Sequence, residues 1–138
     1  MGCGRVGARL AQMLTSGGHE VTILDIKSSA FNRLGHEFSG TTMLGNGIDQ
    51  ELLRRAGIER ADAFVAATQG DNRNIMSSQI AQHVFGVKRV VTRIYDPLRS
   101  DTFAALGLRA ISPTIIGANA FYEELTGDQA PALPMTAR

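Results

Sequence analysis

The sequence predicts an α/β domain with a doubly wound, mainly parallel sheet and helices on both faces. Short β-branched segments alternate with segments of helical periodicity, which is typical of parallel strands joined by crossover helices. A glycine-rich turn opens the chain at Gly2–Gly7, and an acidic residue, Asp25, ends the strand after the first helix. The chain has 138 residues, 43% of them hydrophobic, which is enough for one domain with a substantial core.

The individual elements follow from apolar spacing and from the glycines that interrupt it. Predicted helices span residues 5–16, 49–56, 72–85, 96–106 and 114–126, with a shorter helix beginning at Ser28. Predicted strands span residues 20–25, 41–44, 63–68, 89–94 and 109–112. One stripe of the first helix holds Val6, Leu10, Met13 and Leu14, and the long helix carries Met76, Ile80 and Val84 at four-residue steps.

The start of the chain lacks one expected element. A phosphate-binding glycine turn normally follows a strand, yet Met1 immediately precedes Gly2. That strand would lie centrally, and its absence would leave two neighbouring strands unpaired. We therefore expect the numbered chain to lack native residues at its start; the alternative is an incomplete, weak sheet. Residues 1–126 are expected to form the domain, and residues 127–138, with Pro131 and Pro134, a tail or linker.

Composition and charge argue against several classes of protein. The net charge is +1 and the basic residues are scattered, which gives no reason to expect nucleic-acid binding. No apolar run approaches the length of about 18 residues that spans a bilayer, so we expect no direct membrane insertion. The single cysteine, Cys3, cannot form an internal disulfide, and a cytoplasmic location is expected.

The turn of sequence Gly2-Cys-Gly-Arg-Val-Gly7 matches the G-x-G-x-x-G pattern of Rossmann-like nucleotide-binding domains. Its first glycine permits a tight turn, the second lets the backbone approach phosphates, and the third lets the helix pack closely on the sheet. The helix N-terminus that follows favours an anion. Because glycine turns also occur for geometry alone, the motif leaves phosphate binding open. The candidate residues here are Gly2, Cys3, Gly4, Arg5 and Val6.

Asp25 makes the nucleotide interpretation stronger. It stands where an acidic side chain accepts hydrogen bonds from both ribose hydroxyls, with Ile26 and Lys27 beside it at the end of the strand. A carboxylate at this position repels a 2′-phosphate and favours NAD or an adenosine phosphate over NADP, although Lys27 weakens that preference. The alternative is that Asp25 only caps the next helix.

Further candidates follow the other strands, at the edge of the sheet where such folds bind ligands. Thr68 and Gln69 could line the crevice with backbone groups, and Asn72 and Asn74 could donate hydrogen bonds. Asp71 or Asn72 could instead cap the next helix. Asn46 and Gly47 lie in a turn and could form a wall beside the adenine.

Two arginines and the cysteine have open alternatives. Arg5 could reach a terminal phosphate or a facing subunit, or be a solvated surface residue. Arg93 could point into the crevice or form a buried ion pair. Cys3 lies beside a helix N-terminus, which lowers a thiol pKa, but a redox role is not favoured. The three histidines show no metal-ligand spacing and are expected at the surface.

Taken together, these segments resemble the N-terminal domain of Trk/Ktr potassium-uptake regulatory subunits, also called the RCK domain. The resemblance covers residues 2 to about 125. The segments that carry it are Gly2–Gly7, Gly18–Asp25, Ala61–Thr68, Asn72–Asn74, Lys88–Ile94, Asp96–Pro97 and Leu106–Pro113. The smaller ligand-binding lobe that commonly follows in this family is not found in the numbered chain.

The resemblance implies a non-enzymatic regulatory subunit that binds NAD(H), ADP or ATP and assembles as a dimer or ring beneath a membrane-embedded potassium transporter or channel. By position, it implies that the Gly2–Val6 turn holds phosphate, that Asp25 holds the ribose, and that Thr68, Gln69 and Arg93 line the pocket. Residues 114–126 would pair subunits. The alternative is a truncated NAD-dependent oxidoreductase, but the chain shows no substrate domain and no tyrosine–lysine pair at short-chain dehydrogenase spacing.

Overall fold

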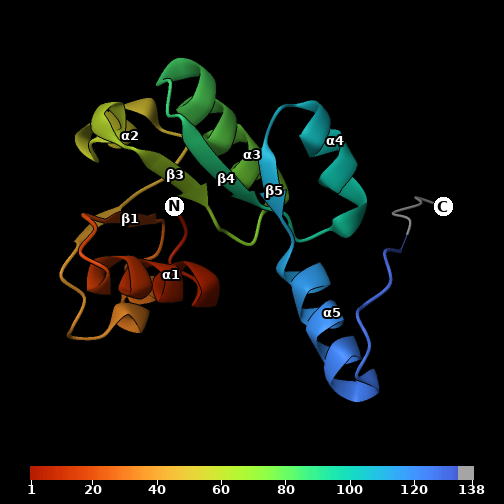
Figure 1. Cartoon of the computed structure of the whole chain (residues 1–138). Helices are drawn as coiled ribbons and strands as arrows, with labels where there is room; N and C mark the ends of the chain where they lie inside the picture. The colour runs from red at the N-terminus through yellow and green to blue at the C-terminus, as the bar shows by residue number, and fades with distance from the viewer. Residues whose placement is uncertain (134–138) are drawn as a thin grey trace.

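A computed structural model describes residues 1–133 of the chain, apart from the side chains of residues 98 and 100–102 (Figure 1). The α-helices are α1 (Arg5–Ser16), α2 (Gln50–Arg55), α3 (Asp71–Gln79), α4 (Ser100–Ala105) and α5 (Pro113–Thr126). The strands are β1 (Thr22–Asp25), β2 (Thr41–Leu44), β3 (Ala63–Ala66), β4 (Arg89–Arg93) and β5 (Arg109–Ile111). Short 3-10 turns η1 (Ser28–Leu34), η2 (Ile58–Arg60) and η4 (Pro97–Arg99), and the π-helical turn η3 (Ile80–Val84), complete the chain. The order of elements agrees with the sequence prediction.

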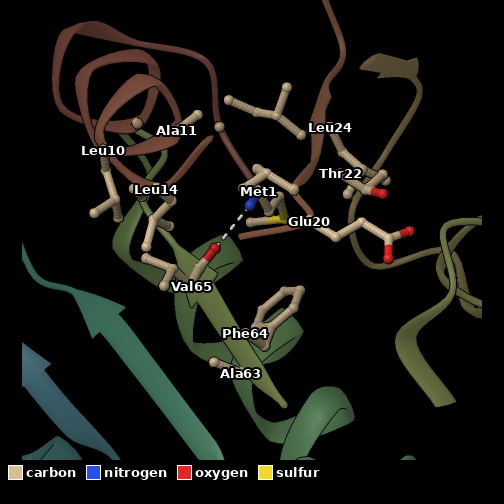
Figure 2. A pocket seen from close by; sticks show the side chains of 15 residues that line it. Met1, Leu10, Ala11, Leu14, Glu20, Thr22, Leu24, Ala63, Phe64 and Val65 are labelled. Carbon is tan, nitrogen blue, oxygen red and sulfur yellow. Dashed lines mark hydrogen bonds between the residues drawn. The ribbon is translucent and has the colours of Figure 1, made fainter. Parts of the chain in front are cut away.

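All strand pairs are parallel, but they form two sheets rather than one. β1 pairs with β2 in the first sheet, and the second sheet has the order β3-β4-β5. β1 and β3 lie side by side across a gap that Met1 partly fills. The Met1 ammonium donates to the Val65 carbonyl at 2.7 Å (Figure 2), the Ala67 amide donates to the Met1 carbonyl at 2.9 Å, and the Gly2 amide donates to the Leu24 carbonyl at 2.7 Å.

Met1 and Gly2 therefore stand where a central strand would run, and they run parallel to both neighbours. The expected consequence of the absent first strand is confirmed: beyond Met1, β1 and β3 have no common partner among residues 1–133. The parallel strands and the helices that cover them make the fold α/β and doubly wound.

The helices cover both faces, because adjacent residues of a strand point to opposite faces. On β1, Leu24 belongs to a core cluster with residues of α2, β3 and β4, among them Leu53, Phe64 and Val90. Its neighbour Ile23 packs in a second cluster beneath α1 and η1, with Cys3 and Ala11. The first cluster draws residues from both sheets, which holds the two sheets together.

Two predicted apolar stripes do not pack as the spacing indicated. On α1 the residues nearest the sheet are small, with Gly7, Ala8 and Ala11 buried, whereas Val6 is 42% and Met13 59% exposed. Close approach of the helix to the glycine turn requires small side chains there. On α3 the buried side chains are Asn74, Ser77 and Ser78, and the predicted stripe residues Met76 of α3 and Val84 of η3 are each more than half exposed.

Candidate functional site

A cavity of about 630 Å³ opens at the carboxyl ends of β1, β3 and β4. The glycine turn forms its floor, the end of β1 forms one wall, and the segment after β3 forms the other. The residues that line it are Met1, Gly2, Cys3, Gly4, Arg5, Val6, Leu24, Asp25, Ile26, Lys27, Ala30, Arg33, Gly45, Gly47, Ala67, Thr68, Gln69, Arg73 and Arg93. This is the crevice in which open parallel α/β sheets bind ligands.

The geometry of the glycine turn excludes other residues at two of its positions. Gly2 adopts φ 94°, and a Cβ there would lie 2.8 Å from the Thr68 backbone nitrogen. A Cβ at Gly7 would lie 1.9 Å from the Gly2 carbonyl oxygen. Gly4 differs, because a Cβ there would meet no atom within 4 Å. The fold therefore requires Gly2 and Gly7, whereas a side chain at Gly4 would meet only open space at the floor of the cavity.

Helix α1 presents an open N-terminus to this cavity. Its N-cap residue is Gly4, which has no side chain to cap the helix, and its first turn contains no acidic residue. The first main-chain hydrogen bond of the helix runs from Ala8 to Gly4. The preceding amides of the first turn are thus available to an anion, and the helix dipole favours negative charge at the same place.

Asp25 points into the glycine turn. Its Oδ2 accepts a hydrogen bond from the Cys3 amide at 2.8 Å, and its Oδ1 accepts one from the Lys27 amide at 2.9 Å. Each carboxylate oxygen retains a second acceptor position, so the side chain can still receive hydroxyl groups. Asp25 does not cap η1, whose N-cap is Lys27 and has no side-chain cap.

The thiol of Cys3 is not activated by the neighbouring helix. Cys3 is fully buried, and its Sγ donates to the Ala30 carbonyl at 3.4 Å. Burial, and secondarily the nearby Asp25 carboxylate, raises the pKa of the Cys3 thiol. The expectation of a lowered thiol pKa was wrong, because loss of hydration outweighs the field of the helix N-terminus. Cys3 packs in the core and contributes backbone to the turn.

A buried asparagine fixes the opposite wall. The Asn74 Oδ1 accepts hydrogen bonds from the Thr68 amide at 2.9 Å and hydroxyl at 2.6 Å. Its Nδ2 donates to the carbonyls of Thr68 at 2.9 Å and Arg93 at 3.0 Å. Asn74 thus links the segment after β3 to the end of β4, and both of its polar atoms are bonded to Thr68 or Arg93. Its role is to position Thr68 and Arg93 at the cavity.

The cavity carries a strong excess of positive charge. Five cationic side chains line it against the single carboxylate of Asp25: Arg5, Lys27, Arg33, Arg73 and Arg93. The ion pairs among the described residues involve Arg54 and Arg99 and use none of these five. The Nε of Arg93 is buried and has no hydrogen-bond partner in the described part of the chain, so the alternative of a buried ion pair at Arg93 is not seen. The cavity is suited to a ligand with several negative charges.

Twelve of the fifteen candidate residues from the sequence line this cavity, and Asn46, Asn72 and the buried Asn74 do not. Asn46 is exposed in its turn, where its side chain accepts from the Ile48 amide. Asn72 is exposed and accepts from Arg99, and the N-cap residue of α3 is Gly70, so that no side chain caps this helix.

Two of the five cationic residues that line the cavity, Arg33 and Arg73, were not among the candidates from the sequence. Arg73 follows directly from the position of Thr68–Asn74 at the edge of the sheet, because the first turn of α3 begins there. Arg33 comes from the far end of η1, and its place depends on how that turn folds back, for which the sequence held no signal.

No group of three or more His, Cys, Asp or Glu side chains in residues 1–133 has the arrangement of a metal site. Over the same range, no helix combines the length and apolar character needed to cross a bilayer.

Comparisons with known proteins show which proteins the chain is similar to. The family model of the TrkA-N domain matches residues 1–113. The Trk system potassium uptake protein TrkA of Streptomyces coelicolor is 47% identical over 112 residues, which is 81% of this chain and 50% of that protein. A TrkA homolog from Pyrococcus abyssi is 34% identical over 131 residues, 91% of this chain and 58% of its own length. The chain thus spans about half the length of these relatives.

Solved structures agree on the fold. The C-terminal domain of Kef from Shewanella denitrificans in an AMP-bound form superposes with a TM-score of 0.77 at 21% identity, covering 91% of this chain and 77% of that one. GsuK bound to ADP superposes with a TM-score of 0.76 at 25% identity, covering 90% of this chain and 32% of that one. The match of the family model and the identity to named relatives decide the assignment: the chain belongs to the TrkA-N domain family.

Proposed function

We propose that this chain is a regulatory module that binds an adenine nucleotide and controls a potassium channel or transporter, without catalytic activity of its own. The observation that carries the proposal is the cavity in which an uncapped helix N-terminus, Asp25 and five cationic side chains converge. Phosphates match the helix amides and the cations, and ribose hydroxyls match the carboxylate.

The charges favour a nucleotide with at least two phosphates. Lys27 and Arg33 lie on the β1 side of the cavity, and Arg73 and Arg93 come from α3 and β4 on the other side. ADP, ATP and NAD(H) all supply a pyrophosphate between an adenosine and a further group. Support for adenine nucleotides also comes from the printed descriptions of the solved relatives, in which Kef is bound to AMP and GsuK to ADP.

The names of the relatives are what supports a potassium transporter as the partner. Several proteins at 34% to 47% identity are Trk system potassium uptake proteins or their homologs. We infer that the partner of this chain is a membrane-embedded potassium transporter or channel subunit, and that the chain works at the cytoplasmic side of the membrane through that partner.

We propose that α5 contacts a second copy of the chain. Figure 1 shows α5 extending away from the two sheets, and none of its residues is buried. Its exposed apolar side chains include Ile116 (59% exposed), Phe121 (73%) and Leu125 (85%). An apolar helix that stands free of its own core is suited to pairing between subunits. Homo-oligomer formation through α5 remains a prediction.

Replacing Asp25 by alanine tests the ribose contact. If the carboxylate holds the ribose, Asp25→Ala should weaken ADP binding by about 1.5–3 kcal/mol, or roughly 10- to 150-fold. Isothermal titration calorimetry with ADP measures the change. Asp62→Ala is the matched control, because Asp62 is an exposed carboxylate outside the cavity and should leave the affinity unchanged.

Since Asp25 also supports the Cys3 amide, a second ligand is needed to separate ribose binding from distortion of the turn. Tripolyphosphate carries phosphates but no sugar. The proposal predicts that Asp25→Ala weakens ADP binding and leaves tripolyphosphate binding intact or stronger. Equal losses for both ligands would mean that Asp25 only shapes the turn, and unchanged ADP affinity would remove it from the site.

A further inference from the structure

The ribose end of the cavity carries more positive charge than an unmodified ribose can use. Lys27 and Arg33 both line the cavity on the β1 side, where Asp25 supplies the single carboxylate. An unmodified ribose offers two neutral hydroxyl groups at this place, and Asp25 alone can accept both of them. Building on the proposed nucleotide site, we propose that its ligand is an adenine nucleotide with a phosphate on the ribose, and that Lys27 and Arg33 bind this phosphate.

Neither of the two cations is paired with Asp25. No ion pair among the described residues involves Lys27, Arg33 or Asp25. The bonds that reach the Asp25 carboxylate come from backbone amides instead, at Cys3 (2.8 Å) and at Lys27 (2.9 Å). The negative charge of Asp25 is thus stabilised by the backbone, and the positive charges of both side chains are left for a ligand.

The charge of a phosphate matches the two cations. A phosphate monoester carries a charge of about −1.5 to −2 at pH 7, which is close to the sum of the Lys27 and Arg33 charges. The sequence predicts that Asp25 repels a 2′-phosphate and that Lys27 weakens this repulsion. Arg33 doubles the positive charge on the same side of the cavity, so that attraction outweighs the repulsion.

One hydroxyl and one phosphate suit these polar groups better than two hydroxyls do. Each oxygen of the Asp25 carboxylate retains an acceptor position, so that the free hydroxyl of a phosphorylated ribose can still donate to it. The neighbouring phosphate would accept charge-assisted hydrogen bonds from the Lys27 ammonium and the Arg33 guanidinium. A phosphate on the 2′ or the 3′ position of the ribose meets this description equally well.

The backbone at Arg33 is held in place by the packing of η1 against α1. The Gln12 side chain donates to the carbonyls of Arg33 at 3.2 Å and Leu34 at 2.9 Å. Ala30 and Leu34 are buried in the core cluster beneath α1. Burial raises the pKa of the Cys3 thiol, whereas Arg33 lowers it, which places the guanidinium beside the glycine turn. Arg33 is therefore presented to the ribose end of the cavity by a fixed part of the fold.

Two pairs of ligands test the proposal, because the members of each pair differ only in one phosphate on the adenosine ribose. NADPH carries a 2′-phosphate that NADH lacks, and coenzyme A carries a 3′-phosphate that dephospho-coenzyme A lacks. Isothermal titration calorimetry of the full chain measures the four affinities, with ADP as the reference for the nucleotide site. We expect one phosphorylated ligand to bind about tenfold more tightly than its partner, and that pair identifies the position of the phosphate.

Two variants identify the groups that bind the phosphate. Lys27→Ala and Arg33→Ala should each weaken binding of the phosphorylated ligand about tenfold and that of its unphosphorylated partner less than about threefold. Both side chains are exposed, so that folding should be unaffected, which thermal unfolding checks. Lys88→Ala and Arg55→Ala are the matched controls, because these residues are exposed outside the cavity and should change neither affinity.

Weaker or equal binding of both phosphorylated ligands relative to their partners would overturn the proposal, because repulsion by Asp25 would then prevail. Equal losses for the two members of a pair in Lys27→Ala and Arg33→Ala would also overturn it, since the cations would then attract any anion. If ADP binds in either case, the proposed nucleotide site stands without the ribose phosphate. Absence of binding by all five ligands would contradict the proposed function and the ribose phosphate site together.

Discussion

Replacement of Gly4 by aspartate is expected to abolish nucleotide binding while leaving the chain as stable as before. A side chain at Gly4 meets no atom within 4 Å, and φ is −76°, which any residue adopts. Aspartate is among the best N-cap residues, so that it would bond to the free amides of α1 and occupy the place of the phosphate. Its charge would also repel the phosphates. We expect the affinity for ADP to fall about 100-fold or more.

Calorimetry with ADP and thermal unfolding, measured on the same samples, test this prediction. Gly4→Asn is the matched control, because asparagine caps a helix equally well without carrying a charge. It should weaken binding less than aspartate does. Full ADP affinity in Gly4→Asp would show that the helix N-terminus does not hold the phosphates.

The free energy of unfolding of the chain that begins at Met1 should rise by about 2 kcal/mol between pH 6 and pH 8. Burial lowers the pKa of the Met1 amine from 8.0 to about 6 in the folded chain. Between these values the unfolded chain binds more protons than the folded chain, so that stability increases with pH. Below about pH 6 the amine is protonated in both states, and the free-energy cost of burying its charge remains in full. Above about pH 8 the amine is neutral in both states.

Urea unfolding at a series of pH values measures the effect. The control is the same chain acetylated at Met1, which has no titrating amine, and the difference between the two pH profiles removes the contribution of every other group. The acetylated chain should lose the rise between pH 6 and 8. Parallel profiles for the two chains would contradict the burial of the Met1 amine.

Much of the fold could be predicted because its signals are local. Glycines at positions 17–18, 57, 86 and 107 end helices or begin turns, and the β-branched segments between them became the five strands. The glycine turn and Asp25 could be found for the same reason: their spacing is fixed by one helix and one strand. Both reach the cavity.

The wrong predictions of buried helix residues came from contacts that depend on the assembled sheet. Met13 and Met76 looked like core residues from periodicity, but close approach to the turn and the Asn74 network selected small or polar residues for the buried faces. The partial exposure of Leu10 and Leu14 depends on how α1 lies over the two sheets. No local pattern could have indicated these results.

If the phosphates of an adenine nucleotide bind at the start of α1, an amide-resolved NMR titration of the unchanged chain with ADP detects the contact at the residues that make it. We expect saturable shifts of the Gly4, Arg5 and Val6 amides, with the side-chain Nε resonance of Arg93 moving in parallel. Saturable shifts confined to other parts of the chain, or none at millimolar ADP, would contradict it.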